Sequence, residues 1–134
     1  MSDFCRSILC ASALVVLFAA PAAAFELTGI WATDAAICGK VFTKKGTEVE
    51  FAELSDLYGS GFIIEGNRIR GKIARCNIAS KKEEGSTIRL TAACSTSVAV
   101  ENVEFEIKVL DDNTLSRIFP GTSGMEVAYH RCTL

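Results

Sequence analysis

The sequence predicts an all-β fold, namely a small antiparallel up-and-down barrel or sandwich of about eight strands with one short helical turn near residues 34–38. Three observations support this prediction. Beyond residue 24, short segments alternate apolar and polar residues with the period of two that a half-buried strand requires. Turn-forming residues separate these segments at short intervals. No window beyond residue 24 keeps the 3.6-residue period of a helix over three turns.

The first half of this pattern gives four strands and the helical turn. The predicted strands are residues 27–33, 48–54, 62–65 and 68–78. After the first strand, Thr33 and Asp34 can cap one helical turn. In the second strand, apolar residues alternate with Glu48 and Glu50. The third and fourth strands form a hairpin, because Gly66-Asn67 between them is typical of a tight turn.

The second half gives four more strands, which are residues 87–94, 103–109, 115–119 and 125–132. The clearest alternation lies in residues 103–109, where valine, phenylalanine and isoleucine alternate with charged residues. Residues 111–113, Asp-Asp-Asn, mark a turn, and residues 120–124 form a glycine-containing loop. Consecutive short strands of this kind predict a closed meander, because closure leaves no unpaired strand edge.

The first 24 residues are predicted to be a signal peptide. Arg6 supplies positive charge, and residues 8–20 are all apolar or small. Pro21 and the three alanines after it fit a cleavage site before Phe25. The apolar run of about 13 residues is shorter than the ~20 that a membrane-spanning helix needs. We therefore expect cleavage, export to the periplasm or the exterior, and no membrane span in the mature chain.

Cleavage would leave residues 25–134, which we expect to form one domain, since half of this length would have little core. Without Arg6 and Asp3, the totals of 14 basic and 16 acidic side chains fall to 13 and 15, so the net charge stays at −2. This balance does not indicate a nucleic-acid-binding protein.

The four cysteines beyond residue 24 predict two disulfides, because an even number of cysteines in a small exported domain is typical of a disulfide framework. They are Cys38, Cys76, Cys94 and Cys132, and no two of them lie within ten residues. A zinc site would need closely spaced pairs. We therefore predict no metal site.

The pairing of the cysteines follows from the predicted register of one hairpin. The apolar side of residues 68–78 changes from odd to even numbers, which predicts a β-bulge near residues 73–75. A three-residue turn at residues 84–86 would place Cys76 opposite Cys94. The hairpin thus predicts a Cys76–Cys94 disulfide and leaves Cys38 to pair with Cys132.

A basic strand is the strongest local charge feature. Arg68, Arg70 and Lys72 belong to a segment, residues 68–89, that carries seven basic and two acidic side chains. These three residues alternate with apolar or small ones, so we expect them on the solvent face, paired with the outward glutamates 48, 50, 104 and 106. The alternative is an anion-binding face. Because aromatic residues for base stacking do not interleave with these cations, we do not expect nucleic acid to be a partner.

The sequence does not predict an enzyme. His130 is the single histidine, and the chain lacks the G-x-S-x-G pattern that presents a serine nucleophile. We expect no cofactor. Two loops could instead bind a partner: Tyr58 stands among polar and glycine residues, and Pro120 stiffens the loop over residues 119–125. Both also suit tight loops that are held against the core.

The stretch "LTGIW" at residues 27–31 resembles the G-x-W start of lipocalin-like barrels, which implies that Trp31 closes one end of a barrel and contributes to binding. Gly29-x-Trp31 followed by Cys38 is also similar to small periplasmic metalloprotease inhibitors. The chain departs from these inhibitors by its two predicted disulfides and by the lack of an evident N-terminal arm before Gly29. The layout, ending in "YHRC", further resembles small exported bacterial proteins of unassigned function.

Together these observations predict an exported monomeric barrel that binds an unknown small ligand or protein. The alternative is an inhibitor of a periplasmic or secreted enzyme. A ligand-binding barrel should contain an apolar cavity of a few hundred Å³. An inhibitor should have a filled interior and an exposed rigid loop at Tyr58 or at residues 120–125. An enzyme should place His130 beside a carboxylate and a nucleophile in a cleft.

Overall fold

The computed structural model describes residues 14–19, 24–121 and 123–134. Most of the predicted signal peptide, including Arg6 and the cleavage motif up to residue 23, lies outside the described residues, as does Thr122. In the part of the chain that is described, no helix has both the length and the apolar character needed to cross a membrane.

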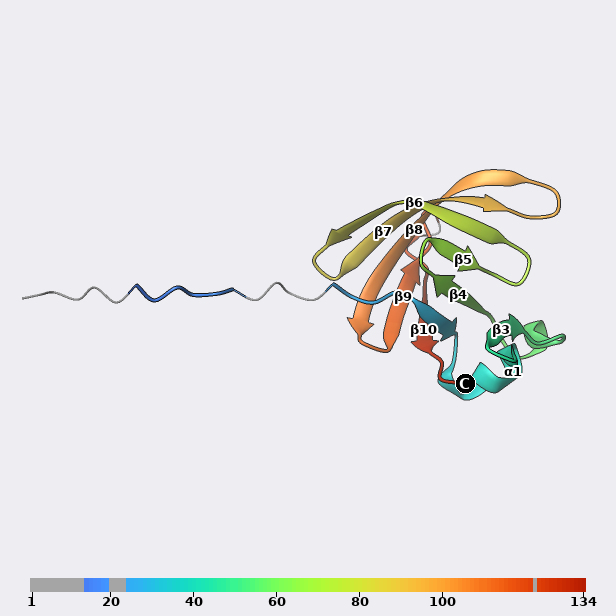
Figure 1. The fold of residues 1–134 in the computed structure, drawn as a ribbon. Coiled ribbons are helices and arrows are strands. Elements are labelled where there is room, and N and C mark those ends of the chain that lie inside the picture. Colours follow the sequence, from blue (N-terminus) through green and yellow to red (C-terminus); the bar gives the residue numbers. More distant parts are fainter. Residues whose placement is uncertain (1–13, 20–23, 122) are drawn as a thin grey trace, which may run out of the picture.

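Eight antiparallel strands close into a barrel, which confirms the predicted fold class (Figure 1). Around the barrel the order is β1, β10, β9, β8, β7, β6, β5 and β4, and β4 pairs back with β1. The strands are β1 (Gly29–Ala32), β4 (Gly61–Glu65), β5 (Arg68–Arg70), β6 (Arg75–Glu84), β7 (Thr87–Ser95), β8 (Val100–Asp111), β9 (Thr114–Ile118) and β10 (Glu126–Arg131). From β4 onward each strand pairs with the next along the chain, which is the predicted up-and-down order.

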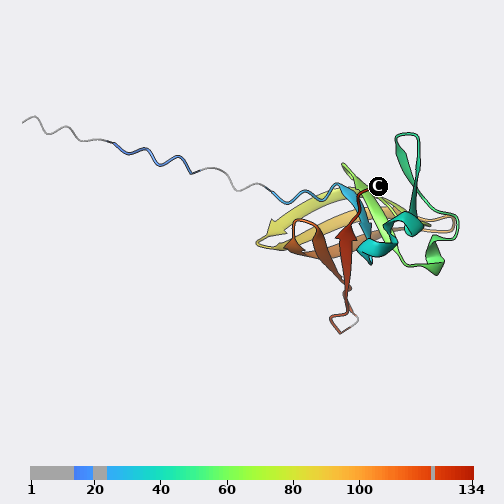
Figure 2. The ribbon, with the colours of Figure 1, turned by 90° about the horizontal axis from the view of Figure 1, so that it is seen from below.

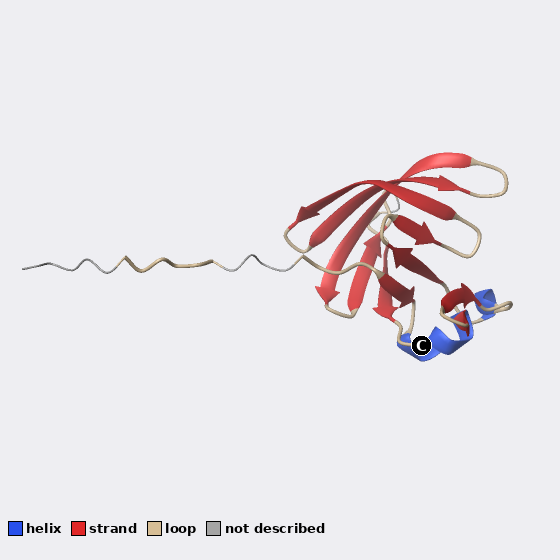
Figure 3. Cartoon of the chain, viewed as in Figure 1, coloured by secondary structure: helices blue, strands red, loops and turns tan. Residues whose placement is uncertain are grey.

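The chain leaves the barrel once, between β1 and β4. This excursion, residues 33–60, contains η1 (Ala35–Ile37), α1 (Cys38–Val41), β2 (Phe42–Lys45), β3 (Glu48–Phe51) and η2 (Ser55–Leu57). The predicted helical turn is present, and the Asp34 carboxylate caps it by accepting a 2.8 Å hydrogen bond from the Ala36 amide. The predicted strand 48–54 ends earlier, at Phe51, and pairs with the unpredicted β2 in a separate two-stranded sheet (Figure 3).

The excursion creates a second hydrophobic core outside the barrel. Side chains alternate along β1 and β4, so Trp31 and Ile64 lie in the barrel core while Ala32 and Ile63 lie in the second core. The second core consists of Ala32, Cys38, Val41, Phe42, Ile63 and Cys132. Figure 2 shows the excursion at the end of the molecule away from residues 24–28, which lead into β1. Both faces of β1 and β4 are therefore covered.

The register of the β6–β7 hairpin differs from the prediction in two places. The turn has two residues, Gly85 and Ser86, so that Glu84 rather than Glu83 pairs with Thr87. The predicted bulge near residues 73–75 is wrong, because residues 71–74 form the turn between β5 and β6. The bulge lies at Ala79 instead, between the paired residues Ile78 and Ser80.

These two differences cancel, so Cys76 lies opposite Cys94 as predicted. Both disulfides are present, Cys76–Cys94 and Cys38–Cys132. The first belongs to the barrel core and the second to the outer core. Cys38–Cys132 therefore ties α1 to the segment that follows β10.

Candidate functional site

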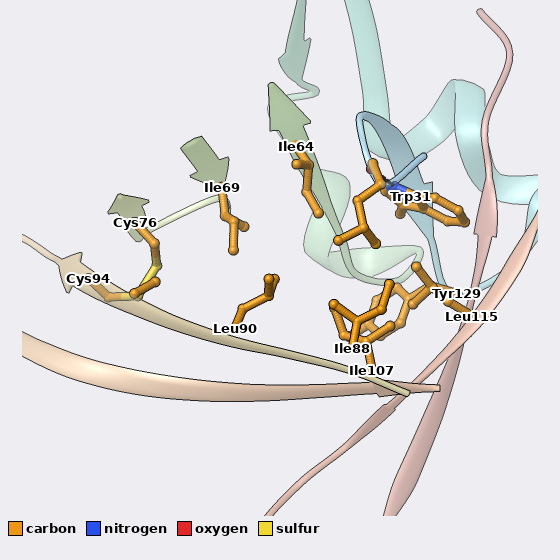
Figure 4. Close-up of a cluster of buried hydrophobic side chains, with 12 residues drawn as sticks. Trp31, Ile64, Ile69, Cys76, Ile88, Leu90, Cys94, Ile107, Leu115 and Tyr129 are labelled. Carbon is orange, nitrogen blue, oxygen red and sulfur yellow. Dashed lines mark hydrogen bonds between the residues drawn. A yellow bond between two sulfur atoms is a disulfide. The ribbon is translucent and has the colours of Figure 1, made fainter. Parts of the chain in front are cut away.

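The barrel interior contains a cavity of about 520 Å³. Small-molecule sites in proteins typically measure about 300–1,000 Å³, so this volume is sufficient for one ligand. Figure 4 shows Ile64 and Ile69 from one wall facing Leu90 and Ile107 from the other. The apolar lining comes from Phe62, Ile64, Ile69, Val103, Phe105, Ile107 and Leu115, together with the Cys76–Cys94 disulfide.

One end of the barrel is closed by Trp31. Its side chain is fully buried, and the indole Nε1 donates a 3.0 Å hydrogen bond to the Leu27 carbonyl. The Arg131 guanidinium lies 4.3 Å from the centre of the indole ring and donates to the carbonyls of Thr28 and Glu26 at 2.8 and 2.7 Å. Trp31 is not among the residues that line the cavity. It therefore belongs to the barrel core and lies outside the cavity lining.

Gly29 is required at this closed end for two reasons. Its φ angle of 153° is one that residues with a side chain rarely adopt. A Cβ atom at this position would also lie 2.6 Å from Arg131 Nη1. The glycine of the G-x-W sequence thus leaves room for the guanidinium that covers Trp31.

The opposite end of the barrel carries the entrance. The β5–β6 and β7–β8 turns lie at this end, as does the loop between β9 and β10. Polar lining residues on this side include Ser60, Thr96 and Glu101. The apolar side chains Ile73 and Val98 stand in the turns and are 82% and 90% exposed. The cavity thus has an apolar floor and a mixed rim.

Among the residues that the structure describes, Arg117 is the one cation that lines this cavity. It follows Leu115 by two positions on β9, and this spacing turns both side chains inward. Its guanidinium lies 4.6 Å from the ring centre of Phe105 and 4.3 Å from that of Phe119. Burial lowers the pKa of Arg117, whereas a hydrogen bond to Tyr129 raises it. Because arginine starts from a very high pKa, the side chain stays positively charged at neutral pH.

Arg117 is not among the residues predicted from the sequence, although the sequence contains a signal for it. In residues 115–119, Leu115, Arg117 and Phe119 share one side of a strand. A cation in phase with large apolar residues is unusual, since charged residues are rarely buried without a partner. The density of cations along the chain is highest in residues 68–89, and it does not indicate Arg117.

The basic strand is less exposed than predicted. Arg68 is exposed, but the side chains of Arg70 and Lys72 are only 27% and 29% accessible. Arg70 donates to the Val49 carbonyl at 3.0 Å and to the Glu65 carboxylate at 2.9 Å. The ion-pair partner of Arg70 is thus the neighbouring residue Glu65 on β4, and not one of the glutamates expected from the sequence.

Lys72 makes equivalent contacts with the other end of the excursion. Its ammonium group donates to the Asp56 carboxylate at 2.8 Å and to the Glu53 carbonyl at 3.2 Å. Arg70 and Lys72 therefore hold the excursion against the barrel. They also line a polar groove of about 490 Å³ together with Arg75. Because Arg70 and Lys72 already contact carboxylates, this groove offers an anion less positive charge than the sequence suggests.

These contacts predict different roles for two arginines of the same strand. Arg70→Met should lower the free energy of unfolding by about 1–2 kcal/mol, because the variant loses two hydrogen bonds made by a charged group. Arg68→Met, the matched control at an exposed position, should change it by less than about 0.5 kcal/mol. Urea unfolding of the two variants measures both values. Equal losses would show that Arg70 does not hold the excursion.

The remaining predicted binding residues lie on separate segments. Tyr58 follows η2 in the excursion, is 51% exposed, and has the Lys40 ammonium 5.1 Å from its ring centre. Pro120 is exposed in the loop after β9 and lines a shallow pocket with Lys82 and Arg89. Neither Tyr58 nor Pro120 lines the barrel cavity.

His130 lies on β10 opposite Thr114, and it does not line the barrel cavity either. Within residues 14–19, 24–121 and 123–134, no group of three histidine, cysteine or acidic side chains could hold a metal ion. The barrel cavity, with Arg117 in its wall, is therefore the candidate functional site. No protein-family model, curated protein or solved structure matches the chain.

Proposed function

We propose that the protein binds an apolar small molecule inside its barrel. The observation that carries this proposal is the cavity of about 520 Å³, which is lined by apolar side chains and open at one end. Burying the apolar surface of a ligand there contributes roughly 25 cal/mol per Å². The closed barrel holds the lining residues in place through strand pairing, so the site is largely formed before the ligand enters.

The cavity favours the ligand-binding hypothesis over the hypothesis that the protein inhibits an enzyme. An inhibitor barrel was expected to have a filled interior, whereas this interior has room for a ligand. The complete burial of Trp31 in the barrel core also supports the proposal of a lipocalin-like barrel. We retain the inhibitor only as the alternative, with exposed Tyr58 as its contact residue.

The proposal includes export and a monomeric state. The two disulfides support an oxidising compartment, because reduced thiols prevail in the cytosol. A small binding barrel in the periplasm or outside the cell would act on ligands that diffuse there. We propose no catalytic role and no nucleic-acid partner.

A neutral apolar dye tests the proposal directly. N-phenyl-1-naphthylamine becomes fluorescent in apolar surroundings, and titration of the mature protein should give saturable binding of one dye per chain. Val103 lines the cavity, so Val103→Trp should fill part of the cavity and weaken binding by about tenfold or more. The control is Leu110→Trp, because Leu110 is 54% exposed, does not line the cavity, and lies at the end of β8 away from the entrance.

Thermal unfolding of both tryptophan variants checks that each is folded before binding is compared. If a folded Val103→Trp variant binds the dye as tightly as the unmodified protein, the barrel interior is not the site. If the unmodified folded protein shows no saturable binding, the proposal is wrong.

A further inference from the structure

We propose that Arg117 binds the anionic head group of an amphiphile whose apolar chain occupies the barrel. This inference rests on the proposed function and adds the chemical class of the ligand. The head group is an oxyanion, either a carboxylate or a phosphate, because the planar guanidinium fork can donate two parallel hydrogen bonds to such a group.

Arg117 lacks a counter-ion in the described structure. None of the ion pairs found in residues 14–19, 24–121 and 123–134 includes it. Glu101 also lines the cavity, but it lies six residues along β8 from Ile107, the residue paired with Arg117. That spacing corresponds to about 20 Å along the strand, so Glu101 cannot neutralise Arg117. A half-buried cation without a partner is costly, and a bound anion would supply the missing charge.

Comparison with Arg131, the other inward-facing arginine, supports a binding role for Arg117. Arg131 donates to the backbone carbonyls of Thr28, Glu26 and Asp112, which accounts for its structural role at the closed end. For Arg117, the polar group that raises its pKa is the Tyr129 side chain, and none of the hydrogen bonds found among the described residues ties its guanidinium to a backbone carbonyl. Because a guanidinium has five N–H donors, Arg117 keeps donors that can reach a ligand.

The aromatic rings around Arg117 fix its position without neutralising it. Phe105 and Phe119 both stack within 4.6 Å of the guanidinium carbon. Such cation–π contacts hold the side chain while leaving its N–H edge open to an acceptor. The Tyr129 side chain also interacts with the guanidinium and raises the pKa of Arg117. A positioned donor loses less conformational entropy on binding than a mobile one.

The position of Arg117 along β9 also sets the orientation of the ligand. Leu115 lies nearer the closed end, and Ile118, which pairs with Glu126, lies nearer the entrance. The head group at Arg117 would therefore lie toward the entrance. The apolar chain would extend toward Ile64, which lines the cavity and pairs with Gly29 at the closed end.

The test compares ligands that share a ten-carbon chain and differ in the head group. Decanoate, decyl phosphate and 1-decanol each displace N-phenyl-1-naphthylamine from the mature protein at pH 7.5. We expect at least one of the two anions to bind about tenfold or more tightly than 1-decanol, since a charge-assisted hydrogen bond adds this much affinity. Arg117→Met should remove that preference, while the affinity for 1-decanol stays within about threefold. The preferred anion distinguishes a carboxylate ligand from a phosphate ligand.

The matched control is Arg89→Met. Arg89 lies on β7 opposite Glu106 and is exposed, so its loss should leave the preference for anions intact. If the unmodified protein binds the dye but all three ligands equally, the inference is wrong while the proposed function stands. The same conclusion follows if a folded Arg117→Met variant keeps the preference. If the unmodified protein binds neither the dye nor any ligand, the proposed function itself is wrong.

Discussion

Replacing both Cys38 and Cys132 with alanine should lower the free energy of unfolding by about 4–5 kcal/mol, the largest effect that we expect from removing one covalent link. The disulfide joins residues that are 94 positions apart. In the chain-entropy model, a cross-link stabilises the folded state by restricting the unfolded chain, and the effect grows with the length of the closed loop. Small domains of this size have little stability in reserve, so this loss approaches the total.

The second disulfide provides a matched control. Cys76 and Cys94 are 18 positions apart, and all four cysteines are buried to a similar extent, between 6% and 8% exposed. Replacing this pair with alanine should cost about 3 kcal/mol in the same model. Urea unfolding of the two double variants under non-reducing conditions measures the difference. A larger loss for the Cys76–Cys94 pair would show that strain or packing, and not loop length, controls the contribution of these disulfides.

The Cys38–Cys132 link also has a local role, because it fastens the excursion to the end of β10. Without it, the excursion would depend on the outer core and on the contacts of Arg70 and Lys72. Amide hydrogen exchange in α1 should therefore rise more than exchange in β7 when the link is removed.

The sequence predicts the barrel well where one face of a strand is buried and the other is exposed to solvent. In β8 the inward residues Val103, Phe105 and Ile107 alternate with charged residues, so the alternation shows both the strand and its inward face. The same alternation predicts β7, where the inward residues Ile88, Leu90, Ala92 and Cys94 are all buried. These strands form the wall of the cavity.

The prediction is weaker where a second core covers the outer face. The stretches Gly29–Ala32 and Gly61–Glu65 contain consecutive apolar residues, because Ala32 and Ile63 pack under the excursion. Period-two alternation is lost in such strands, as it is in sheets buried on both sides. The excursion itself depends on contacts between residues distant in the chain, and β2 has one buried residue, Phe42, in its span. The local alternation of apolar and polar residues therefore does not predict the excursion.

The cavity could not be predicted from the pattern of residues. Alternation identifies which side chains face inward, but whether they fill the interior depends on the barrel diameter and on the sum of their volumes. The cavity lining includes the small residues Gly71, Ala74 and Ala99 and the Cys76–Cys94 disulfide, which lie in or next to the turns at the entrance and leave space there. Arg117, in contrast, could have been found, because its phase on β9 follows directly from Leu115 and Phe119.

Trp31→Ala should lower the free energy of unfolding by about 3–5 kcal/mol, since removal of a buried aromatic side chain loses its transfer energy and leaves a cavity. The indole is fully buried between Leu27 and the barrel core, and it supports Arg131 on its other side. Trp31→Phe keeps part of the ring volume, so it should lower the free energy of unfolding by less than Trp31→Ala does. Thermal unfolding of both variants measures the difference, and a loss below about 1 kcal/mol for Trp31→Ala would contradict the proposed closing role.

Arg131→Met tests whether Trp31 and Arg131 act as one unit. The variant loses charge-assisted hydrogen bonds to the Thr28 and Glu26 carbonyls, which should cost about 1.5–3 kcal/mol. The guanidinium packs on the indole. The double variant Trp31→Ala/Arg131→Met should therefore lose less free energy of unfolding than the sum of the two single losses, by about 0.5–2 kcal/mol. Strict additivity would mean that the two residues stabilise the barrel independently. Because Trp31 does not line the cavity, folded Trp31→Phe should still bind the neutral dye, which separates packing at the closed end from recognition of the ligand.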